Sequence, residues 1–572
     1  MKRILAFLLA MVMVLALVAC AKTPATDNNT PTDANTPAQD QTDDTKEPAD
    51  DQTEDNTGDS NLAEIDQKVE KVDDPYGGLQ LPLSDGSETF RFFRERSRAF
   101  DYFGYTNYEQ IPGYLEAEKL TGVKIDWEPV SDFATQFPLM VASGDWADCA
   151  ASYTGGGQLA TYVGDEVLLD LTDYIPTYAK NYMSRRTEDA AIARDTSTDE
   201  GLLLCFYNIK QTAQGSWCGL WARADWLEQA GMGAIKTYDD MENFLLWAKD
   251  NHSDTLTIPY IFNKTGLDPY LLAGYDLSTN WIVDNGVVKY SPLQPAMKDY
   301  VEKMRDWYAS GAINDFAFSG ERLWFDDYAQ GGCAMATAFQ QWFDTVYAYA
   351  LEGDTFDMVA VGCPMIDENH HRRIESSTSP KTRNEALTSY IFTSCKNPEL
   401  LCQWFDFFYT DAGCMLCDYG IEGESYYYDE DGKATFVDSI LHPSKDKGYG
   451  YTTAWLEYVI DGIPHYYDWT RELNDGMPES GKAACGIWDE GWVDELTYPN
   501  FATRNTKEAE TYSSIMSDIE TLVNENIPKF IRGDQSMDQW DSFIAQVEAM
   551  NVAEAIKIQQ DSYDRYMARP VD

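Results

Sequence analysis

The chain has 572 residues, and its 96 acidic side chains against 43 lysines and arginines give a formal net charge of −53. This charge excludes nucleic acid and anionic surfaces as partners, because both repel an acidic protein. The length allows a large core in more than one lobe.

The chain opens with a signal-peptide pattern that ends at a cysteine. A short basic start precedes an apolar run, residues 4–18, which is below the roughly 20 residues that a membrane-spanning helix needs. Val18 and Ala19 stand directly before Cys20, a pattern that resembles the lipobox of bacterial lipoproteins. The resemblance implies that residues 1–19 are removed and that the thiol of Cys20 is lipidated. The alternative is an ordinary secretory signal with a chance cysteine.

An acidic, polar segment follows the cysteine. Residues 21–75 hold 16 acids and 4 lysines and almost no large apolar side chain. Such a segment cannot bury enough surface to offset its chain entropy, and its charges repel one another. We therefore expect residues 20–80, with the lipidated cysteine, to be a disordered tether. No later stretch reaches 18 apolar residues, so we expect no other membrane segment.

Strands and helices alternate in the part that follows. Buried strands are expected at 89–93 and 123–127, with a helix over 108–121 between them. A helix-length crossover between two strands favours a parallel sheet. Further expected elements here are helices over 133–142 and 172–182 and a strand at 167–171.

A strand over 217–223 opens the next part and runs into a helix that ends at Gly231. Thr237 and Asp240 then form the capping box of a long amphipathic helix. The remaining expected elements are a helix over 295–310, strands at 331–336, 358–361 and 387–392, a helix over 398–410, a hairpin turn at 429–433, and helices over 506–531, 536–549 and 552–567.

Ten cysteines follow Cys20 and are scattered singly through apolar segments. An exported protein permits disulfides, but isolated cysteines in such surroundings are typical of small buried residues, and both interpretations stay open. Cys414 and Cys417 have the spacing of a redox or zinc pair, but they lack a second pair or a nearby histidine. The turn at 429–433 is too short for a calcium loop. We expect no metal and no cofactor.

Six short motifs, in this order, resemble the extracellular solute-binding proteins of carbohydrate ABC transporters (family 1). They are Thr121-Gly122-Val123-Lys124-Ile125, Leu139-Met140-Val141-Ala142-Ser143-Gly144-Asp145 with Asp148, Arg223-x-Asp225-Trp226-Leu227, Lys396-Asn397-Pro398-Glu399, Tyr419-Gly420-Ile421-Glu422-Gly423 and Phe530-Ile531-x-Gly533. The resemblance spans about residues 85–570. This chain departs from the family at Ala147, usually a proline, and at Phe92-Phe93, often a tryptophan.

The resemblance implies an α/β, two-lobed, periplasmic-binding-protein-like fold (type II) whose hinge has three crossings. On this sequence the crossings would fall near Ser216–Leu220, Thr337–Gln341 and Ile391–Ser394. The first lobe would then comprise residues 81–216 and 340–393, and the second lobe residues 217–339 and 394–572.

The implied function is an extracellular substrate-binding lipoprotein that captures a carbohydrate or oligosaccharide between its lobes and delivers it to ABC permease subunits. Its place would be the extracellular face of the bacterial cell membrane, held by the lipid anchor. Two alternatives stay open: an exported glycoside hydrolase, which needs two carboxylates, and a surface protein that binds glycans without transport. No Gly-x-Ser-x-Gly or His-Glu-x-x-His motif is present, so we expect a protein that is not an enzyme, with no catalytic residues.

A sugar site pairs flat aromatic rings, which cover C–H faces, with planar polar groups that bind hydroxyls. Positions 217, 221 and 223 would share one face of an extended strand. Near the implied crossings the candidates are Trp217, Trp221, Arg223, Phe339, Gln340 and Trp342. The family resemblance adds Trp488 and Trp492, and turns of the first lobe add Asp145, Asp148 and Tyr153.

Each candidate also has a purely structural interpretation. The tryptophans could pack in the core, the aspartates could cap helices or form turns, and Arg223 could pair with Asp225 or Glu228. Three further tryptophans, Trp226, Trp404 and Trp540, are expected in the core.

Overall fold

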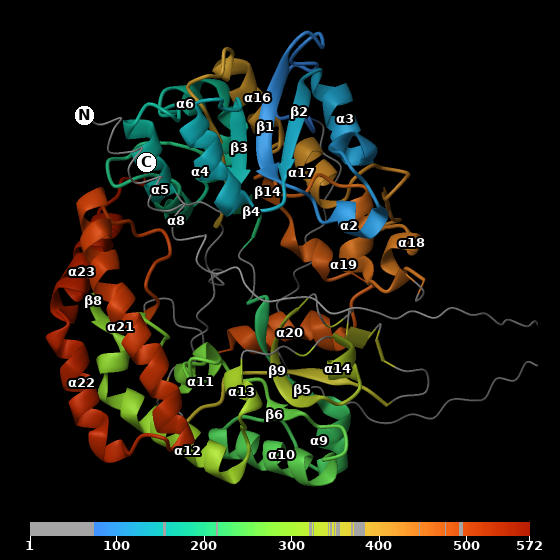
Figure 1. The fold of residues 1–572 in the computed structure, drawn as a ribbon. Coiled ribbons are helices and arrows are strands. Elements are labelled where there is room, and N and C mark those ends of the chain that lie inside the picture. Colours follow the sequence, from blue (N-terminus) through green and yellow to red (C-terminus); the bar gives the residue numbers. More distant parts are fainter. Residues whose placement is uncertain are drawn as a thin grey trace, which may run out of the picture. The chain divides into compact units, whose positions relative to one another are not determined.

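The computed structural model describes residues 74–571 apart from 153–155, 213–215, 320–322, 324, 341–342, 344–345, 348, 351–354, 368–369, 371–383, 445–446, 475 and 491–495. All described residues belong to one compact unit, residues 64–572. Within that unit two sheets, each with its own helices, form two lobes (Figure 1). Cys20 and almost all of the expected tether lie outside the described residues.

The first lobe is built on a six-stranded sheet in the order β14-β4-β11-β3-β1-β2. Its strands are β1 (Thr89–Glu95), β2 (Lys124–Val130), β3 (Cys149–Ser152), β4 (Phe206–Lys210), β11 (Asn384–Ile391) and β14 (Tyr466–Tyr467). β1 pairs in parallel with β2 and β3, and β4 pairs in parallel with β14. β11 is antiparallel to both β3 and β4. The other five strands therefore all point the same way.

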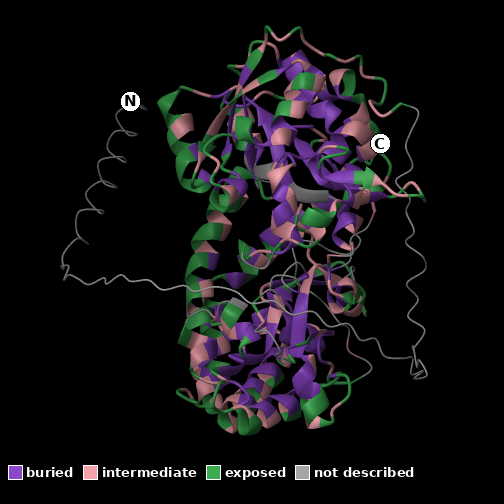
Figure 2. Cartoon of the chain, turned by 90° about the vertical axis from the view of Figure 1, so that its right-hand side faces the viewer, coloured by how far each residue is buried: buried purple, intermediate pink, exposed green. Residues whose placement is uncertain are grey.

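Helices cover both faces of this sheet, so the side chains of β1 enter two separate cores. Phe92 lies in one buried cluster with Trp404 and Phe405, and Phe93 lies in another with Phe133. Figure 2 shows the buried strands beneath their helices. The helices are α2 (Ala99–Phe103), α3 (Pro112–Thr121), α4 (Phe133–Ser143), α5 (Gly156–Gly164), α6 (Tyr174–Tyr178), α7 (Lys180–Arg186), α8 (Ala190–Asp195), α16 (Pro398–Phe407), α17 (Asp411–Asp418), α18 (Asp438–Leu441) and α19 (Tyr451–Ala454), with 3-10 turns at Tyr108–Gln110, Trp455–Glu457 and Trp469–Glu472.

Local sequence signals predict most of these elements. The strand expected at 89–93 and the helix expected over 133–142 are confirmed as β1 and α4. The helix expected over 108–121 is divided at Ile111, because Pro112 starts α3 afresh at its first turn. The strand expected at 167–171 is wrong: only Leu168 forms an isolated bridge, with Phe392.

The second lobe holds a four-stranded sheet in the order β10-β5-β9-β6. Its strands are β5 (Cys218–Arg223), β6 (Ile258–Tyr260), β9 (Cys333–Phe339) and β10 (Met358–Val361). β5 is antiparallel to β9 and β10, and β6 is parallel to β9. A separate hairpin joins β7 (Trp281–Asp284) to β8 (Val287–Tyr290).

The helices of the second lobe share one large core with this sheet. They are α9 (Ala224–Ala230), α10 (Tyr238–Asn251), α11 (Pro269–Leu272), α12 (Pro295–Ser310), α13 (Phe316–Ser319), α14 (Phe325–Ala329), α20 (Glu479–Asp489), α21 (Thr506–Arg532), α22 (Trp540–Ala549) and α23 (Val552–Met567), with 3-10 turns at Ala273–Tyr275, Ser291–Leu293 and Met537–Gln539. The Thr237–Asp240 capping box is confirmed, as are the bounds expected for α12 and α23.

The lobe boundaries expected from the sequence are wrong in the second half of the chain. Residues 358–361 were expected in the first lobe, but β10 pairs with β5 of the second sheet. Residues 398–407 were expected in the second lobe, but α16 packs its Trp404 against Phe92 of β1, with ring centroids 6.1 Å apart. The first sheet also takes β14, so the chain returns to the second lobe only after Tyr467.

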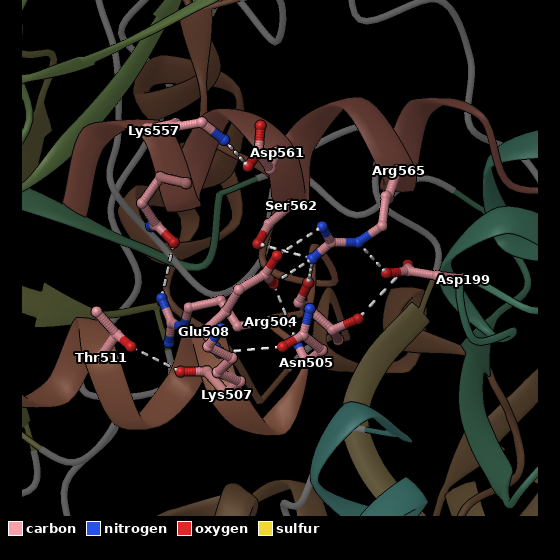
Figure 3. Close-up of polar contacts among 12 residues, drawn as sticks. Asp199, Arg504, Asn505, Lys507, Glu508, Thr511, Lys557, Asp561, Ser562 and Arg565 are labelled. Atoms are coloured by element: carbon pink, nitrogen blue, oxygen red, sulfur yellow. Dashed lines mark hydrogen bonds and ion pairs between the residues drawn. The ribbon is translucent and has the colours of Figure 1, made fainter. Parts of the chain in front are cut away.

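An ionic cluster joins the carboxyl-terminal helix to the first lobe (Figure 3). Asp199 follows α8, whose Ile192 lies in a core of the first lobe. Its carboxylate accepts hydrogen bonds from Arg565 Nε at 2.9 Å and from Arg569 Nε at 2.8 Å. Arg565 also binds both oxygens of Glu508 on α21, at 3.0 and 2.6 Å. These ion pairs therefore join the two lobes, in addition to the segments of chain that pass from one lobe to the other.

None of the ten cysteines in the described part of the chain is in a disulfide, and all but Cys218 and Cys395 are buried. Cys414 and Cys417 lie in α17, where burial raises the pKa of both thiols well above the usual value. The turn at 429–433 joins β12 (Tyr426–Tyr428) to β13 (Ala434–Phe436), which confirms the expected hairpin.

Candidate functional site

The five parallel strands of the first sheet all end at one edge of that sheet. β1, β3, β4 and β14 end there at Glu95, Ser152, Lys210 and Tyr467. Ligands of open α/β sheets bind outside the carboxyl ends of the strands, where the loops are free to vary. We call this edge of the first sheet, and the equivalent edge of the second sheet described next, the crossing edges.

The second sheet has an equivalent edge, which is joined to the first sheet by segments of the chain that connect the lobes. β9 and β10 end at Phe339 and Val361, which pair with Cys218 and Leu220 at the start of β5. The chain runs from Lys210 to Cys218 on its first passage between the sheets, and from Val361 to the start of β11 on its second. A third passage leaves Tyr467 and reaches the start of α20. The first two passages therefore connect one crossing edge to the other. The third reaches the opposite end of β10, because Ser480 at the start of α20 lies beside Tyr347, which accepts the backbone N–H of Met358.

These passages correct the crossings expected from the sequence. The first expected crossing, Ser216–Leu220, overlaps the real passage but runs into β5. Thr337–Gln341 begins inside β9. Ile391–Ser394 begins at the last residue of β11, and its Phe392 pairs with Leu168 and donates its backbone N–H to the carbonyl of Asp148, within the first lobe. Apolar strands of both lobes look alike in sequence, so the resemblance could not tell a strand end from a crossing.

Three of the predicted ligand residues lie together at the crossing edge of the second lobe. The backbone N–H of Gln340 donates to the carbonyl of Trp217 at 2.7 Å. The rings of Trp217 and Phe339 meet edge to face, with centroids 6.0 Å apart. Phe339 is 42% exposed, and Trp217 is half-buried. This group therefore presents aromatic surface at the edge where the lobes are joined.

Gln340 adds a polar group to the two rings. Its side chain is buried, and its Nε2 has no hydrogen-bond partner among the described residues. A buried amide without a partner is unfavourable by about 1–3 kcal/mol.

Three other predicted ligand residues belong to the core of the second lobe instead. Trp221 is 1% exposed, and its ring meets Tyr328 edge to face at 5.8 Å. Trp488 is also buried and donates its indole N–H to the carbonyl of Leu220 at 2.8 Å. Arg223 forks onto Asp225 at 2.8 and 2.6 Å, as the structural interpretation expected.

The alternation argument behind Trp221 and Arg223 fails for a physical reason. β5 begins at Cys218, so Trp217 stands before the strand and shares no strand face with the others. Both faces of β5 are covered, because Leu220 and Trp221 are both buried. A sheet covered on both sides has no open face for a ligand.

Asp145 and Asp148 lie away from the crossing edge of the first lobe. Both precede β3, at its amino end, whereas the crossing edge lies at its carboxyl end. Asp148 accepts the backbone N–H of Arg91 at 2.8 Å, and Asp145 pairs with the Arg91 guanidinium at 2.9 Å. Their role here is to hold β1 beside β3. Tyr153, Trp342 and Trp492 lie outside the described residues.

Contacts that the sequence did not predict fix the first passage. The carboxylate of Asp489, on α20, accepts the backbone N–H of Ser216 at 2.7 Å. Trp469, beside the third passage, donates its indole N–H to Thr212 at 3.0 Å. Gly219 lies so close to the Trp488 ring that an added Cβ would be 2.5 Å from it. No local pattern in the sequence predicts contacts between segments that are so far apart along the chain.

Buried carboxylates near the two edges serve the scaffold. Burial raises the pKa of Asp418, but His465 and Arg471 outweigh it, and the net pKa is lowered. Asp418 also accepts the backbone N–H of Asp468 at 2.7 Å, so it anchors the start of the third passage. In the second lobe burial raises the pKa of Asp268 to about 6, although Tyr260 and two backbone N–H groups donate to it.

Comparisons with known proteins agree with this fold. The family profile of bacterial extracellular solute-binding proteins matches residues 104–413. The alginate-binding protein AlgQ2, solved without calcium ion, is 19% identical with a TM-score of 0.65, over 84% of this chain and 99% of its own. An HMO-binding, ABC-transporter-associated solute-binding protein of Bifidobacterium longum infantis is 15% identical with a TM-score of 0.67, over 84% and 99% of the two chains.

A third solved structure is the S. pneumoniae ABC-transporter substrate-binding protein FusA, an EF-hand mutant with fructo-nystose. It is 18% identical with a TM-score of 0.66, over 84% of this chain and 100% of its own. No curated protein matches the chain. Within the described ranges, no helix has the length and hydropathy of a membrane-spanning segment. With more than half of its length matched by the family profile and its fold matched by these two-lobed structures, the chain belongs to the bacterial extracellular solute-binding protein family.

Proposed function

We propose that this protein is the substrate-binding lipoprotein of an ABC importer and that its substrate is a carbohydrate, most of all an oligosaccharide. The observation that carries the proposal is the group of Trp217, Phe339 and Gln340 at the crossing edge. Aromatic rings beside a planar amide suit the C–H faces and hydroxyls of a sugar. The similar solved proteins are described as binding alginate, HMO and fructo-nystose.

The proposed mechanism is closure around the sugar. A ligand held at both crossing edges makes more contacts when the edges approach, so it stabilises the closed arrangement. The connecting passages supply the hinge, and Asp489 and Asp418 hold the ends of two of them. The closed, loaded protein then delivers its sugar to the permease.

A thermal-shift screen against malto-, cello-, xylo- and fructo-oligosaccharides tests the proposal, because a ligand that binds only the folded protein raises its melting temperature. For a sugar that binds, calorimetric titration of Trp217→Ala should show a loss of about 1–3 kcal/mol in affinity. The control is Trp247→Ala, another half-buried tryptophan, on α10 of the same lobe. Equal affinities of both variants and the wild type would contradict the site.

The same samples separate binding from catalysis. A solute-binding protein should return each oligosaccharide unchanged after long incubation. New reducing ends would instead support the alternative of a glycoside hydrolase, whose two carboxylates cleave the glycosidic bond.

The anchor is the part of the proposal that rests on sequence alone. Membership in an extracellular family supports export, and two acyl chains on Cys20 would hold the protein stably on the outer face of the cell membrane. Replacing Cys20 by alanine should release the protein or leave an unlipidated precursor. A variant that still fractionates with membranes like the wild type would contradict the lipid anchor.

A further inference from the structure

The first lobe carries an aromatic surface that the residues discussed so far leave unexplained. It consists of Tyr102, Phe103, Tyr105 and Tyr449, named here the first-lobe platform. We propose that this platform binds the outer sugar units of the same oligosaccharide that the second lobe holds at Trp217. The inference rests on the proposed function and adds a second sugar-binding surface to it.

The position of the platform follows from the topology. β1 ends at Glu95 on the crossing edge, and α2, with Tyr102 and Phe103, is the first helix after it. Tyr449 directly precedes the region of α19, and Figure 1 shows α2 and α19 side by side in the first lobe. Segments more than 300 residues apart in the sequence thus bring their rings together beside the strand end where ligands of such sheets bind.

The four rings form one continuous group. Tyr449 meets Tyr102 edge to face with centroids 5.9 Å apart, and it meets Phe103 in the same way at 5.8 Å. Phe103 in turn lies 5.8 Å from Tyr105. Tyr102 is 50% exposed, whereas the other three are half-buried. Tyr102 is thus held by ring contact and presents half of its surface to solvent.

The platform lies on the hydrophobic cores of the first lobe and is held in place by them. Phe103 and Tyr105 pack against one core and Tyr449 packs against another, whereas Tyr102 is exposed. The other side of α2 is anchored, because Ala99 and Phe100 are buried and Phe100 lies 5.0 Å from the Tyr108 ring. A rigid base that exposes a ring is suited to ligand contact, since little conformational freedom is lost on binding.

Polar groups around the rings favour a sugar over an apolar partner. Tyr105 donates its hydroxyl to Glu457 at 3.5 Å, and Lys447 lies 5.7 Å from the centre of the Tyr449 ring. Three of the four rings carry a phenol hydroxyl. Alternating C–H faces and hydroxyls of a sugar chain match such a surface, whereas a lipid would cover these polar groups without offering them hydrogen bonds.

The proposal predicts that the platform matters only to long sugars. On this proposal a disaccharide held at Trp217 does not reach the platform, so its affinity should not depend on Tyr102. In calorimetric titration with the disaccharide and with longer oligomers of the series that binds, Tyr102→Ala should weaken the longest oligomers about tenfold or more. Tyr102→Phe keeps the ring and should restore most of that affinity.

A matched control is Tyr427→Ala, which removes a tyrosine that is 47% exposed on β12 of the same lobe. It should bind every oligomer like the wild type, and neither alanine variant should change the melting temperature of the free protein by much. Affinities of Tyr102→Ala that equal the wild type at all lengths would overturn the platform. An equal loss at all lengths would also overturn it, because it would place Tyr102 in the inner site.

The outcomes distinguish this inference from the proposed function. If no oligosaccharide binds the wild-type protein, both fail together. If sugars bind and depend on Trp217 but not on Tyr102, only the platform fails. Normal sugar binding by Tyr102→Ala, with weaker stimulation of the permease ATPase, would instead assign the surface to a protein interface and overturn the proposal.

Discussion

Trp217 and Trp221 are only four residues apart in the sequence, but they belong to different parts of the molecule. Trp221 lies inside β5 and is 1% exposed against Tyr328. Trp217 precedes the strand and lies half-buried beside Phe339, which is 42% exposed. The comparison shows that position relative to the crossing edge, and not residue type, decides whether a ring fills the core or is open to a ligand.

The largest expected effect is on the buried member of the pair. Trp221→Ala removes a ring from the packed core of the second lobe and should lower the free energy of unfolding by about 3–5 kcal/mol. Urea denaturation followed by circular dichroism measures this change. The same substitution at Trp404, which is 1% exposed in the first lobe, should cost a similar amount. A loss below about 1 kcal/mol at Trp221 would break the comparison.

A smaller loss of stability is expected at Gly219, which lies between the two tryptophans in the sequence. Gly219→Ala places a Cβ 2.5 Å from the Trp488 ring, so the ring must shift and the protein should lose about 1–3 kcal/mol of stability. Gly233→Ala is the control, because an added Cβ there meets nothing within 4 Å. Equal stabilities of the two variants in urea would show that Trp488 moves freely and that the start of β5 is loosely packed.

The smallest change in stability is expected at the edge itself. Phe339→Ala removes a ring that is 42% exposed, so the free energy of unfolding should move by about 0.5 kcal/mol or less. Affinity for a sugar should nevertheless fall, since Phe339 shares its surface with Trp217. Denaturation and titration of one sample report both quantities. A large loss of stability with unchanged affinity would place Phe339 in the core beside Trp221.

The sequence predicts the local elements well, since their signals lie within a few residues. Pro295 and Gly311 bound α12 as expected, and Thr237 caps α10 through its bond from the Asp240 N–H. The sequence fails where the answer depends on distant partners. Residues 358–361 form an apolar strand that either sheet could accept, and only its pairing with β5 assigns the lobe.

The candidate site divides in the same way. The sequence predicted Trp217, Phe339 and Gln340, and these residues meet in space. They do so because the start of β5 pairs with the end of β9. Trp221 and Arg223 were also predicted but are buried, because both faces of β5 are covered. Trp488, which the family resemblance suggested, is buried on α20. The platform around Tyr102 was missed entirely, because its rings come together only in the folded lobe.

The place of β11 has a consequence for how the protein folds. β11 lies between β3 and β4 in the first sheet. Along the chain, however, all strands of the second sheet lie between β4 and β11. Until β11 is inserted, β3 and β4 keep edges whose backbone groups are unpaired. Such long-range pairing slows folding and leaves strand edges open to association with other chains. Refolding of this protein should therefore be slow and sensitive to its concentration, and the first lobe should be the last to become protected from hydrogen exchange.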